Sequence, residues 1–352
     1  MSNPIFAIGL GIGTQSNAGD WLEVFYSKLF QKNEKNAAAV DDFMRIIKEN
    51  FDYTGGNATL SLENCDLISL IKTFKDTNHE GSATFCEDIL LSASEDRAVI
   101  CILETDVPAE DTPSAYLKLQ LLSHRMIKPH GTDLSGIFAV LPNVAWTNQG
   151  AIALEDLHDR RMEARLLEEH LSVESIDKFP KMTDYVVPNG VRIADTARVR
   201  LGAYLGEGTT IMHEGFCNFN AGTEGTSMIE GRISAGVFVS EGSDLGGGCS
   251  TMGTLSGGNN VIISIGKNCL IGANAGVGIP LGDRCTVEAG LYVTAGSVVT
   301  ILAKDGSTQT AKARDLANIT DLLFRRNSIS GAIEVLANGN AIELNSELHD
   351  NN

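Results

Sequence analysis

An apolar residue returns every six positions from Ile193 to Val299, usually with glycine or another small residue close behind. Neither an α-helix nor a hairpin strand has a period of six, whereas a hexapeptide repeat does. In that repeat three short parallel strands make one turn of about eighteen residues, and glycine permits the tight corners. The apolar positions are Ile193, Val199, Leu205, Ile211, Cys217, Ile233, Val239, Leu245, Ile265, Ile271, Val277, Leu281, Val287, Val293 and Val299. The pattern predicts a left-handed parallel β-helix, a three-sided prism that winds against the usual right-handed crossover.

The six-residue spacing breaks three times: once at a short step from Val277 to Leu281, and twice at longer interruptions, residues 218–232 and residues 246–260. Both are polar and rich in glycine, and a purely structural prism gains nothing from such insertions. Binding and catalytic residues concentrate on loops held by a rigid scaffold. We therefore expect the chemistry of this protein to lie in the two interruptions.

The residues before the repeat predict an α/β domain, because helical and strand periods both occur there. Residues 41–48 predict an amphipathic helix, residues 98–103 a buried strand, and residues 115–126 a second helix that Pro129 stops. Residues 151–170 are charged and amphipathic, which predicts a further helix that acts as an external brace or a subunit contact.

The end of the repeat divides the chain further. We expect an N-terminal α/β domain with its bracing helix over residues 1–185, the β-helix over residues 186–303 and a C-terminal tail over residues 304–352. Glycine supplies 36 of the 352 residues, more than the average of about 7%. Most of the excess falls within the repeat, where the corners are expected.

A net charge of −18 makes nonspecific binding to nucleic acid or to an anionic membrane unfavourable. An anionic ligand would need a local cationic pocket. The seven cysteines are odd in number and form no CxxC pair, and no cleavable signal sequence is evident, so we expect reduced thiols in the cytoplasm. No apolar stretch approaches the roughly 18 to 20 residues that span a bilayer.

Glu230 and Arg232 stand out in the first interruption, on either side of Gly231. A carboxylate there could deprotonate an amine nucleophile or carry an acyl group covalently. A guanidinium could hold a carboxylate of the substrate or of the acyl donor through two parallel hydrogen bonds. An ion pair on an outward face explains the same two residues equally well from spacing alone.

His213 and Glu214 precede the first interruption. His213 is the only histidine inside the repeats, which disfavours the zinc-dependent carbonic anhydrase form of the prism, since that site needs three imidazoles. Glu214 could bind a hard cation such as Mg²⁺ together with its copies in a trimer, although a solvated carboxylate is the simpler interpretation. Glu214 is therefore the candidate metal ligand.

Residues 246–248 are three consecutive glycines, which allow a ligand to approach the backbone closely or simply form a tight loop. The tail is locally basic, with Lys312, Arg314, Arg325 and Arg326. These cations suit the phosphate groups of coenzyme A, and equally they suit acidic patches of the same protein.

The start of the chain also carries a glycine-rich segment, Gly-Leu-Gly-Ile-Gly-Thr at residues 9–14. A dinucleotide-binding loop has the spacing GxGxxG after a strand and before a helix. The spacing here is GxGxG and no clear strand precedes it, so we do not predict a nucleotide site.

Longer motifs resemble the tetrahydrodipicolinate (2,3,4,5-tetrahydropyridine-2,6-dicarboxylate) N-succinyltransferase family, in its long form with an N-terminal domain. The resemblance covers nearly the whole chain, apart from parts of residues 30–110 and the last twenty. Its motifs are far more specific than the hexads, which many acyl- and nucleotidyltransferases share. They are found at residues 13–15, 21–26, 141–148, 212–216, 227–236, 252–258, 271–276 and 323–328.

The resemblance implies the transfer of a succinyl group from succinyl-CoA to the amino group of L-2-amino-6-oxopimelate, the opened form of tetrahydrodipicolinate. This reaction belongs to the succinylase branch of diaminopimelate and lysine biosynthesis. The implied working unit is a homotrimer, with each active site between neighbouring prisms. In this interpretation the β-helix is the acyltransferase domain and the tail binds coenzyme A.

The resemblance assigns catalysis to Glu230, as a covalent acyl carrier or as a general base, and both roles stay open. It implies acyl-CoA contacts at positions that carry small residues where the arm must pass and cations where phosphates would lie. These are Arg232, Gly247, Ser250, Ala273, Glu288, Ala289, Gly296, Lys312, Arg325, Arg326, Asn327 and Ser328. Some members hold Mg²⁺ on the trimer axis between two acidic positions; Glu214 matches one of these, whereas Ala197 occupies the other.

Two alternatives remain beside this function. One is a related hexapeptide acyltransferase with a different acyl donor or acceptor, which a panel of donors would separate. The other is a noncatalytic scaffold built on the prism, which would bind no coenzyme A and would not need the two polar interruptions.

Overall fold

The computed structural model describes residues 6–77, 79–91, 97–253 and 261–337. The chain divides into two compact units: the first comprises residues 1–121 and 132–180, and the second comprises residues 122–131 and 181–352. Within the described ranges, no helix is both long and apolar enough to cross a membrane.

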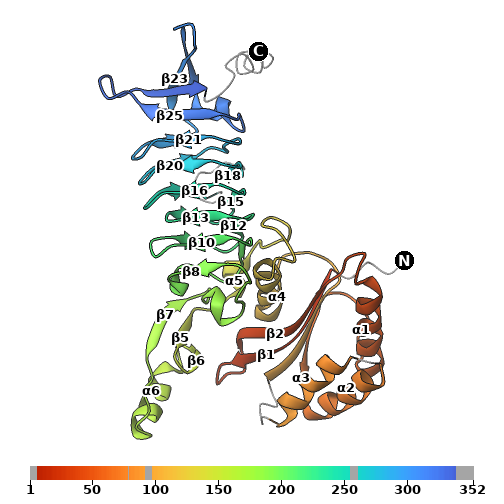
Figure 1. Ribbon diagram of the computed structural model, residues 1–352. Helices are drawn as coiled ribbons and strands as arrows, with labels where there is room; N and C mark the ends of the chain where they lie inside the picture. Colours follow the sequence, from red (N-terminus) through yellow and green to blue (C-terminus); the bar gives the residue numbers. More distant parts are fainter. Residues whose placement is uncertain (1–5, 78, 92–96, 254–260, 338–352) are drawn as a thin grey trace. The chain divides into compact units, whose positions relative to one another are not determined.

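The first unit contains an antiparallel sheet with the strand order β2-β1-β4-β3. Its strands are β1 (Ala7–Gln15), β2 (Trp21–Gln31), β3 (Ala58–Leu62) and β4 (Ala98–Leu103). Figure 1 shows helices α1 (Ala37–Asn50), α2 (Asn64–Asp76) and α3 (Glu80–Leu91) beside this sheet. Alternate residues of β1 and β4, such as Ile8 and Ile100, join the helices in a buried cluster around Phe43 and Phe74. The predicted α/β character of this part is confirmed.

The local predictions for the first unit are partly right. The helix at residues 41–48 is confirmed within α1 and the strand at residues 98–103 as β4. The helix predicted at residues 115–126 is confirmed only as far as Ser123, where α4 (Thr112–Ser123) ends before the predicted stop at Pro129. The buried Gln120 of α4 bonds the backbone of β2, accepting from the N–H of Tyr26 at 3.1 Å and donating to the carbonyl of Val24 at 2.8 Å.

The single helix predicted at residues 151–170 is wrong. Residues at its start form β6 (Gly150–Ala153), and only α6 (Leu157–Leu166) is helical. β6 pairs with β5 (Val144–Thr147), which also pairs with β7 (Val173–Asp177), so the backbone groups of residues 150–153 are satisfied in a sheet instead of a helix. A short helix, α5 (Ile137–Val140), precedes β5.

The glycine-rich start of the chain is a strand. Gly9 and Gly11 of β1 lie against the ring of Tyr26, and Gly13 lies against Trp21. A Cβ on Gly9 would come within 2.5 Å of Cδ1 of Tyr26, and one on Gly13 within 2.6 Å of Cζ3 of Trp21. These glycines therefore make room for aromatic side chains of the paired strand β2.

The second unit is the predicted left-handed parallel β-helix. Its coils comprise β8 (Arg192–Ile193), β9 (Ala203–Leu205), β10 (Thr209–Ile211), β11 (Phe216–Cys217), β12 (Ala221–Thr223), β13 (Ser227–Ile229), β14 (Arg232–Ile233), β15 (Phe238–Val239), β16 (Asp244–Leu245), β17 (Ser250–Thr251), β18 (Ser264–Ile265), β19 (Leu270–Ile271), β20 (Gly276–Gly278), β21 (Thr286–Val287) and β22 (Tyr292–Thr294). Short 3₁₀ turns at Met182–Asp184 and Thr196–Arg198 precede the regular coils.

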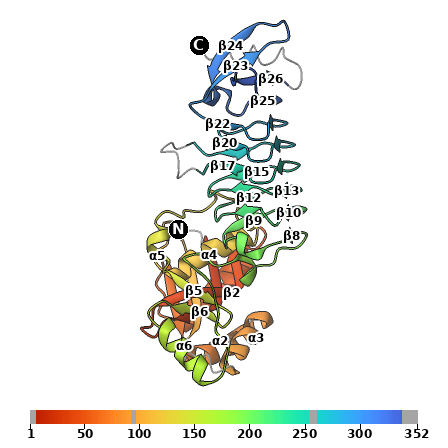
Figure 2. The same cartoon turned by 90° about the vertical axis from the view of Figure 1, so that its left-hand side faces the viewer.

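These strands stack into three faces. Face 1 contains β8, β10, β13, β16, β19 and β21 in that order; face 2 contains β11, β14, β17, β20 and β22; face 3 contains β9, β12, β15 and β18. Figure 1 shows the strands of face 1 one above another, and Figure 2 shows β9, β12 and β15 in the same relation.

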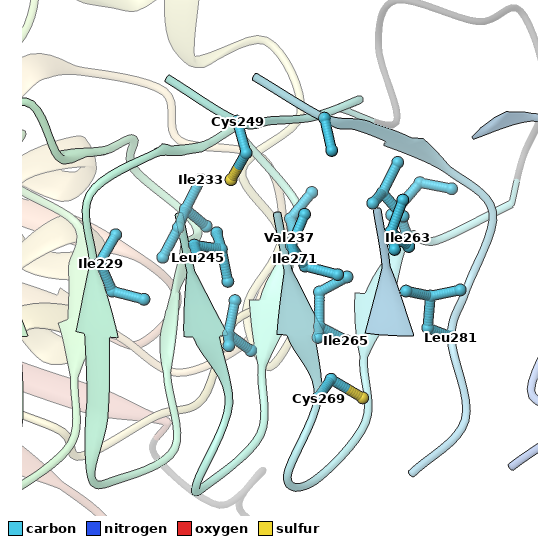
Figure 3. Packing of buried hydrophobic residues seen from close by; sticks show 14 of the residues in the cluster. Ile229, Ile233, Val237, Leu245, Cys249, Ile263, Ile265, Cys269, Ile271 and Leu281 are labelled. Atoms are coloured by element: carbon cyan, nitrogen blue, oxygen red, sulfur yellow. The ribbon is translucent and has the colours of Figure 1, made fainter. Parts of the chain in front are cut away.

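The predicted apolar positions form the core of the prism. All of them are buried except Ile193, which is half-buried and packs against the same cluster. Residues at equal positions of successive coils pair in register, as Ile229, Leu245 and Ile271 do on face 1 (Figure 3). The six-residue period therefore reflects one inward side chain for each face.

The two interruptions are shorter than predicted. Thr223 and Ile229 occupy inward, fully buried positions at the usual spacing, so the repeat continues through residues 218–229. Thr251 likewise fills the inward position six residues after Leu245. What remains irregular is a four-residue step after Ile229 and an insertion after Thr251, of which residues 254–260 lie outside the described part.

Beyond the last coil the six-residue period ends, as predicted after Thr300, and the chain is still regular. It continues as β23 (Val298–Leu302), β24 (Thr308–Lys312), a 3₁₀ turn (Ala313–Leu316), β25 (Leu322–Arg326) and β26 (Ile333–Ala337). These four strands, here called the cap, extend face 1 because β25 pairs in parallel with β21. Of the predicted tail, residues 338–352 lie outside the described part.

Candidate functional site

A shortened corner between faces 1 and 2 carries Glu230 and Arg232. The step between inward residues takes four residues here (229–233), but six in the coil below (211–217) and six in the coil above (245–251). Two residues that the neighbouring coils have at this corner are therefore missing, and the backbone is recessed between them.

The recess is a pocket of about 320 Å³. It is lined by Arg198, Glu214, Phe216, Gly231, Arg232, Gly248 and Cys249. Gly231 is needed for the tight corner, because a Cβ there would lie 2.3 Å from Sγ of Cys249 and 2.7 Å from its carbonyl oxygen. The first interruption thus places a cavity at Gly231 and Arg232, the two residues that follow Glu230.

Glu230 is held by the coil above it. Its N–H donates to the carbonyl of Leu245 at 2.8 Å, and its carbonyl accepts from the N–H of Gly248 at 3.3 Å. A Cβ on Gly247 would lie 3.5 Å from Oε2 of Glu230, so the half-buried carboxylate lies beside that glycine. The N–H of Gly247 donates to no atom of the described residues and is available to a ligand.

Arg232 lies on the outward side of face 2, where it contacts Ser250 of the next coil. Its Nε and Nη2 atoms donate to Oγ of Ser250 at 3.2 and 3.0 Å. Arg232 is exposed and pairs with no carboxylate in the described part of the chain, so the remaining N–H donors of its guanidinium can bind a ligand. The structure thus brings together the predicted residues Glu230, Arg232, Gly247 and Ser250.

The same outward column continues below Arg232. Arg232 pairs in register with Phe216, and the bridge between Val199 and Cys217 places Arg198 one coil below Phe216. The guanidinium of Arg198 donates from Nε to the carbonyl of Gly215 at 2.9 Å and from Nη2 to the carbonyl of Glu214 at 3.1 Å. The pocket therefore has a guanidinium at each end and an aromatic ring between them.

Cys249 is the thiol nearest to this site. Burial raises its pKa to about 12, while the charges of Arg232 and Glu230 shift it in opposite directions, down and up respectively. A thiol with this pKa stays protonated near neutral pH, so Cys249 is not a nucleophile here.

Small residues line the corner above Glu230. On face 1, successive coils stack Glu230, Gly246, Gly272 and Glu288, and each N–H donates to the carbonyl of the residue that precedes the next member. Ala273 and Ala289 follow Gly272 and Glu288 and are exposed at the same corner. With about 4.8 Å between neighbouring strands, the four steps from Glu230 to the cap span about 19 Å.

The cap holds the cationic end of this corner. Oε2 of Glu334 accepts from Nε of Arg325 at 2.9 Å, and Oε1 accepts from Nδ2 of Asn327 at 2.7 Å. Oε2 of Glu288 accepts from the N–H of Arg326 at 2.6 Å. The predicted residues Glu288, Arg325, Arg326 and Asn327 are therefore one connected group.

The remaining predicted contacts lie elsewhere on the cap. Gly296 and Lys312 are neighbours, because the carbonyl of Ser297 accepts from the N–H of Ala313 at 2.8 Å. Both are exposed, as is Ser328 in the turn after β25. β24, which carries Lys312, is separated from β25 by two strands.

The candidate metal ligand does not fit a magnesium site within one chain. Glu214 is exposed, and its Oε1 lies 3.3 Å from Nδ1 of His213. Ala197, at the second expected position, offers no ligand. Among the described residues there is no group of three His, Cys, Asp or Glu side chains that could hold a metal ion, and Glu214 supplies only one of the carboxylates that, with water, complete a Mg²⁺ octahedron. We derive no chemical step through a metal.

Two residues of this region were missed in the sequence. Arg198 precedes Phe216 by one full turn of the repeat, and each stands directly before an inward residue; this register would have placed Arg198 on the outward side of face 2. Glu334 carried no such signal, because it lies on β26, outside the six-residue pattern.

Comparison with known proteins yields two family models. One, described as the tetrahydrodipicolinate N-succinyltransferase middle region, matches residues 141–181. The other, a hexapeptide repeat of succinyltransferases, matches residues 262–295.

Similar proteins match over the full length. The chain is 57% identical over 354 residues to a 2,3,4,5-tetrahydropyridine-2,6-dicarboxylate N-succinyltransferase of Pseudomonas putida, with 100% of both chains covered. It is 53% identical over 348 residues to the enzyme of the same name from Vibrio cholerae, with 99% of each covered. A crystal structure described as a tetrahydropyridine-2-carboxylate N-succinyltransferase from Campylobacter jejuni has a TM-score of 0.86 at 32% identity, covering 97% of this chain and 94% of the other.

Proposed function

Because the chain belongs to the tetrahydrodipicolinate N-succinyltransferase family, we propose that the shortened corner around Glu230 is where it transfers the succinyl group. The enzyme uses succinyl-CoA as the donor and the amino group of L-2-amino-6-oxopimelate as the acceptor, in the succinylase branch of lysine biosynthesis. The observation that carries the assignment of the site is the pocket that two guanidinium groups line, at Gly231 and Arg232, the two residues that follow Glu230.

The reaction exchanges a thioester for an amide. The acceptor nitrogen forms a bond to the thioester carbonyl carbon, the bond from that carbon to sulfur breaks, and coenzyme A leaves as a thiol. One proton must leave the attacking amine. Glu230 would receive it, or would attack the thioester itself and pass the acyl group on.

Negative charge develops on the thioester oxygen during attack. Gly247 lies beside the Glu230 carboxylate, and its N–H is unused within the described residues. We assign it the role of stabilising this oxygen, because a fixed backbone donor needs no reorganisation. Arg232 would bind the free carboxylate of the succinyl group, since its guanidinium is exposed and unpaired with acid in the described part.

The donor would lie along the corner from Glu230 to the cap. The small residues leave room for an extended pantetheine arm, and about 19 Å separates Glu230 from the cationic cap. The proposed acyl-CoA contacts are Arg232, Gly247, Ser250, Ala273, Glu288, Ala289, Gly296, Lys312, Arg325, Arg326, Asn327 and Ser328. In these terms residues 1–185 are the N-terminal domain, 186–303 the acyltransferase domain and 304–352 the coenzyme A-binding segment.

The proposed assembly is a homotrimer in the cytoplasm, with each active site between neighbouring prisms. Exposed apolar side chains on face 1, Met228 at 44% and Leu270 at 51%, support burial against another copy. Light scattering coupled to size-exclusion chromatography measures the assembly directly.

The test of function is free-thiol release from succinyl-CoA, with and without 2-aminopimelate as a stable acceptor, and with acetyl-CoA in parallel. Acceptor-dependent release that favours succinyl-CoA is expected. Release from acetyl-CoA alone would indicate a related acyltransferase with another donor, and no release from either donor by the folded protein would contradict the proposal.

A further inference from the structure

Two guanidinium groups face one pocket without a carboxylate partner in the described part of the chain. Arg198 donates to the backbone carbonyls of Gly215 and Glu214, and Arg232 donates to Oγ of Ser250. Each guanidinium has five N–H donors, so both retain donors for a ligand. In a chain with a net charge of −18, such a pair is a local site for an anion.

The two cations are spaced by the repeat itself. Arg198, Phe216 and Arg232 occupy equivalent outward positions in three successive coils of face 2. With about 4.8 Å for each step, the backbones of Arg198 and Arg232 are about 10 Å apart. The ring of Phe216, half-buried in the pocket wall, lies between them. A cationic end, an apolar middle and a second cationic end suit a flexible chain with anionic groups.

One acid, Glu214, also lines the pocket, and the position of its carboxylate affects whether the electrostatic potential near Arg198 favours an anion. The side chain of Glu214 is exposed, and its Oε1 lies 3.3 Å from Nδ1 of His213. Only its backbone carbonyl contacts Arg198 among the hydrogen bonds of the described residues. Gly231 and Arg232 line the other end of the pocket, and Glu230 precedes Gly231 in the chain. The end that carries Arg198 is therefore free for a second anionic group.

We propose that Arg198 binds the carboxylate of the acceptor that is farther from its amino group. This inference rests on the proposed function, in which Arg232 holds the succinyl carboxylate and Glu230 meets the amine. The backbone of Arg198 lies two coils below that of Arg232, at the end of the pocket away from Arg232 and Glu230, so we assign to Arg198 the carboxylate that is farther from the amine. The methylene groups of the acceptor then pack on Phe216. Arg198 thus selects a dicarboxylate over a monocarboxylate.

The test compares two acceptors in wild type and in Arg198→Gln. The acceptors are 2-aminopimelate and 2-aminohexanoate, which lacks the distal carboxylate. In Arg198→Gln we expect KM for 2-aminopimelate to rise about 10- to 100-fold, the range for loss of hydrogen bonds between charged groups. KM for succinyl-CoA should stay within about twofold, and the preference for 2-aminopimelate over 2-aminohexanoate should fall by the same 10- to 100-fold.

A matched control is Arg200→Gln. Arg200 lies in the same coil, and its Nη1 donates to Oδ1 of Asn218 at 3.2 Å, but it does not line the pocket. Arg200→Gln removes the same charge but leaves the pocket lining intact, so the acceptor preference of this variant should equal that of wild type. If Arg198→Gln does not fold, Arg198→Lys tests the inference instead. Lysine keeps the positive charge but lacks the planar guanidinium, so we expect KM for 2-aminopimelate to rise several-fold.

The outcomes separate the inference from the function. If wild type shows acceptor-dependent release from succinyl-CoA while the acceptor preference of Arg198→Gln equals that of Arg200→Gln, the inference alone is wrong. If wild type shows no such release, the proposed function is wrong and the inference falls with it. A loss of preference confined to Arg198→Gln supports both.

Discussion

The carboxylate of Glu334 is bound by the guanidinium of Arg325, with Oε2 lying 2.9 Å from Nε and 2.8 Å from Nη2. Its other oxygen accepts from Nδ2 of Asn327, and the Glu334 side chain is only 10% exposed. Arg325 is 44% exposed, so one edge of its guanidinium is fixed and the rest faces solvent. Glu334 therefore orients two of the residues that we place against coenzyme A.

Glu334→Gln should weaken binding of succinyl-CoA without slowing the chemistry. The amide keeps one acceptor oxygen where the carboxylate has two, so it cannot accept from both Arg325 and Asn327, and the hold on Arg325 weakens. We expect KM for succinyl-CoA to rise about tenfold, as for one charge-assisted hydrogen bond, with kcat within about twofold. Steady-state kinetics at saturating acceptor measure both.

The matched control is Asp305→Asn. This acid lies in the turn between β23 and β24 of the same cap, where its carboxylate accepts from the N–H and Oγ of Ser307. It removes one negative charge from the cap without touching Arg325. An equal rise in KM in both variants would mean that Glu334 acts through its charge alone and not through the position of Arg325.

The contribution of Glu334 to stability should depend on pH. Hydrogen bonds from Asn327 and Arg325 hold its pKa below the ordinary glutamate value of 4.5. A carboxylate whose pKa is lower in the folded state stabilises the fold above its unfolded pKa, and this is lost as the pH falls through the folded pKa. The difference in unfolding free energy between wild type and Glu334→Gln should thus be constant above about pH 5 and shrink below it. Denaturant unfolding across this range measures it, and a difference that grows on acidification would contradict the assignment.

Gly231→Ala should disturb the site by steric overlap of the added methyl group, and not by backbone strain. Its Cβ would lie 2.3 Å from Sγ and 2.7 Å from the carbonyl oxygen of Cys249, and that oxygen cannot move without breaking its bond from the N–H of Arg232. Overpacking of this kind costs about 1–3 kcal/mol, and we expect kcat/KM to fall at least tenfold because Glu230 and Arg232 flank the residue.

Gly225→Ala is the control for that substitution. Its Cβ would meet only the side chain of Glu241, at an ordinary contact distance of 3.4 Å. Its stability should change by no more than about 0.5 kcal/mol. Thermal unfolding and kinetics of the two variants side by side test the claim; equal stability of both would show that the corner yields more easily than its geometry indicates.

The β-helix could be predicted from the sequence because the chain reaches a new face about every six residues and places one inward side chain on it. The length of the interruptions could not, because only apolar residues were counted as inward. Thr223 is fully buried, and its Oγ1 lies 2.6 Å from Oγ1 of Thr209; Thr251 donates from Oγ1 to the carbonyl of Arg232 at 3.0 Å. A threonine whose hydroxyl is satisfied fills an apolar position, so the pattern seemed to break where it continues.

The candidate site, too, could be predicted only in part from the sequence. Glu230 and Arg232 were singled out in the sequence because they lie in the first interruption, and the family resemblance assigned a role to each. Arg198 lies in another coil and Glu334 on the cap, and their positions near the proposed site follow from stacking and from the pairing of β25 with β26. Since the cap lacks the six-residue period, its antiparallel pairing had no local signal.

The last prediction concerns the role of Glu230, because the two mechanisms predict different release of coenzyme A before the acceptor is added. A covalent carrier would release one equivalent of coenzyme A per site before any acceptor is added, whereas a general base would release none. We expect no such burst, because a thioester is already activated and a deprotonated amine can attack it directly. Rapid mixing of the enzyme with succinyl-CoA and a thiol reagent measures this. Glu230→Gln should lower kcat by about 10²- to 10⁴-fold in either mechanism, so the variant identifies the residue and the burst identifies its role. A burst of one equivalent in wild type that is absent in Glu230→Gln would instead establish the acyl carrier.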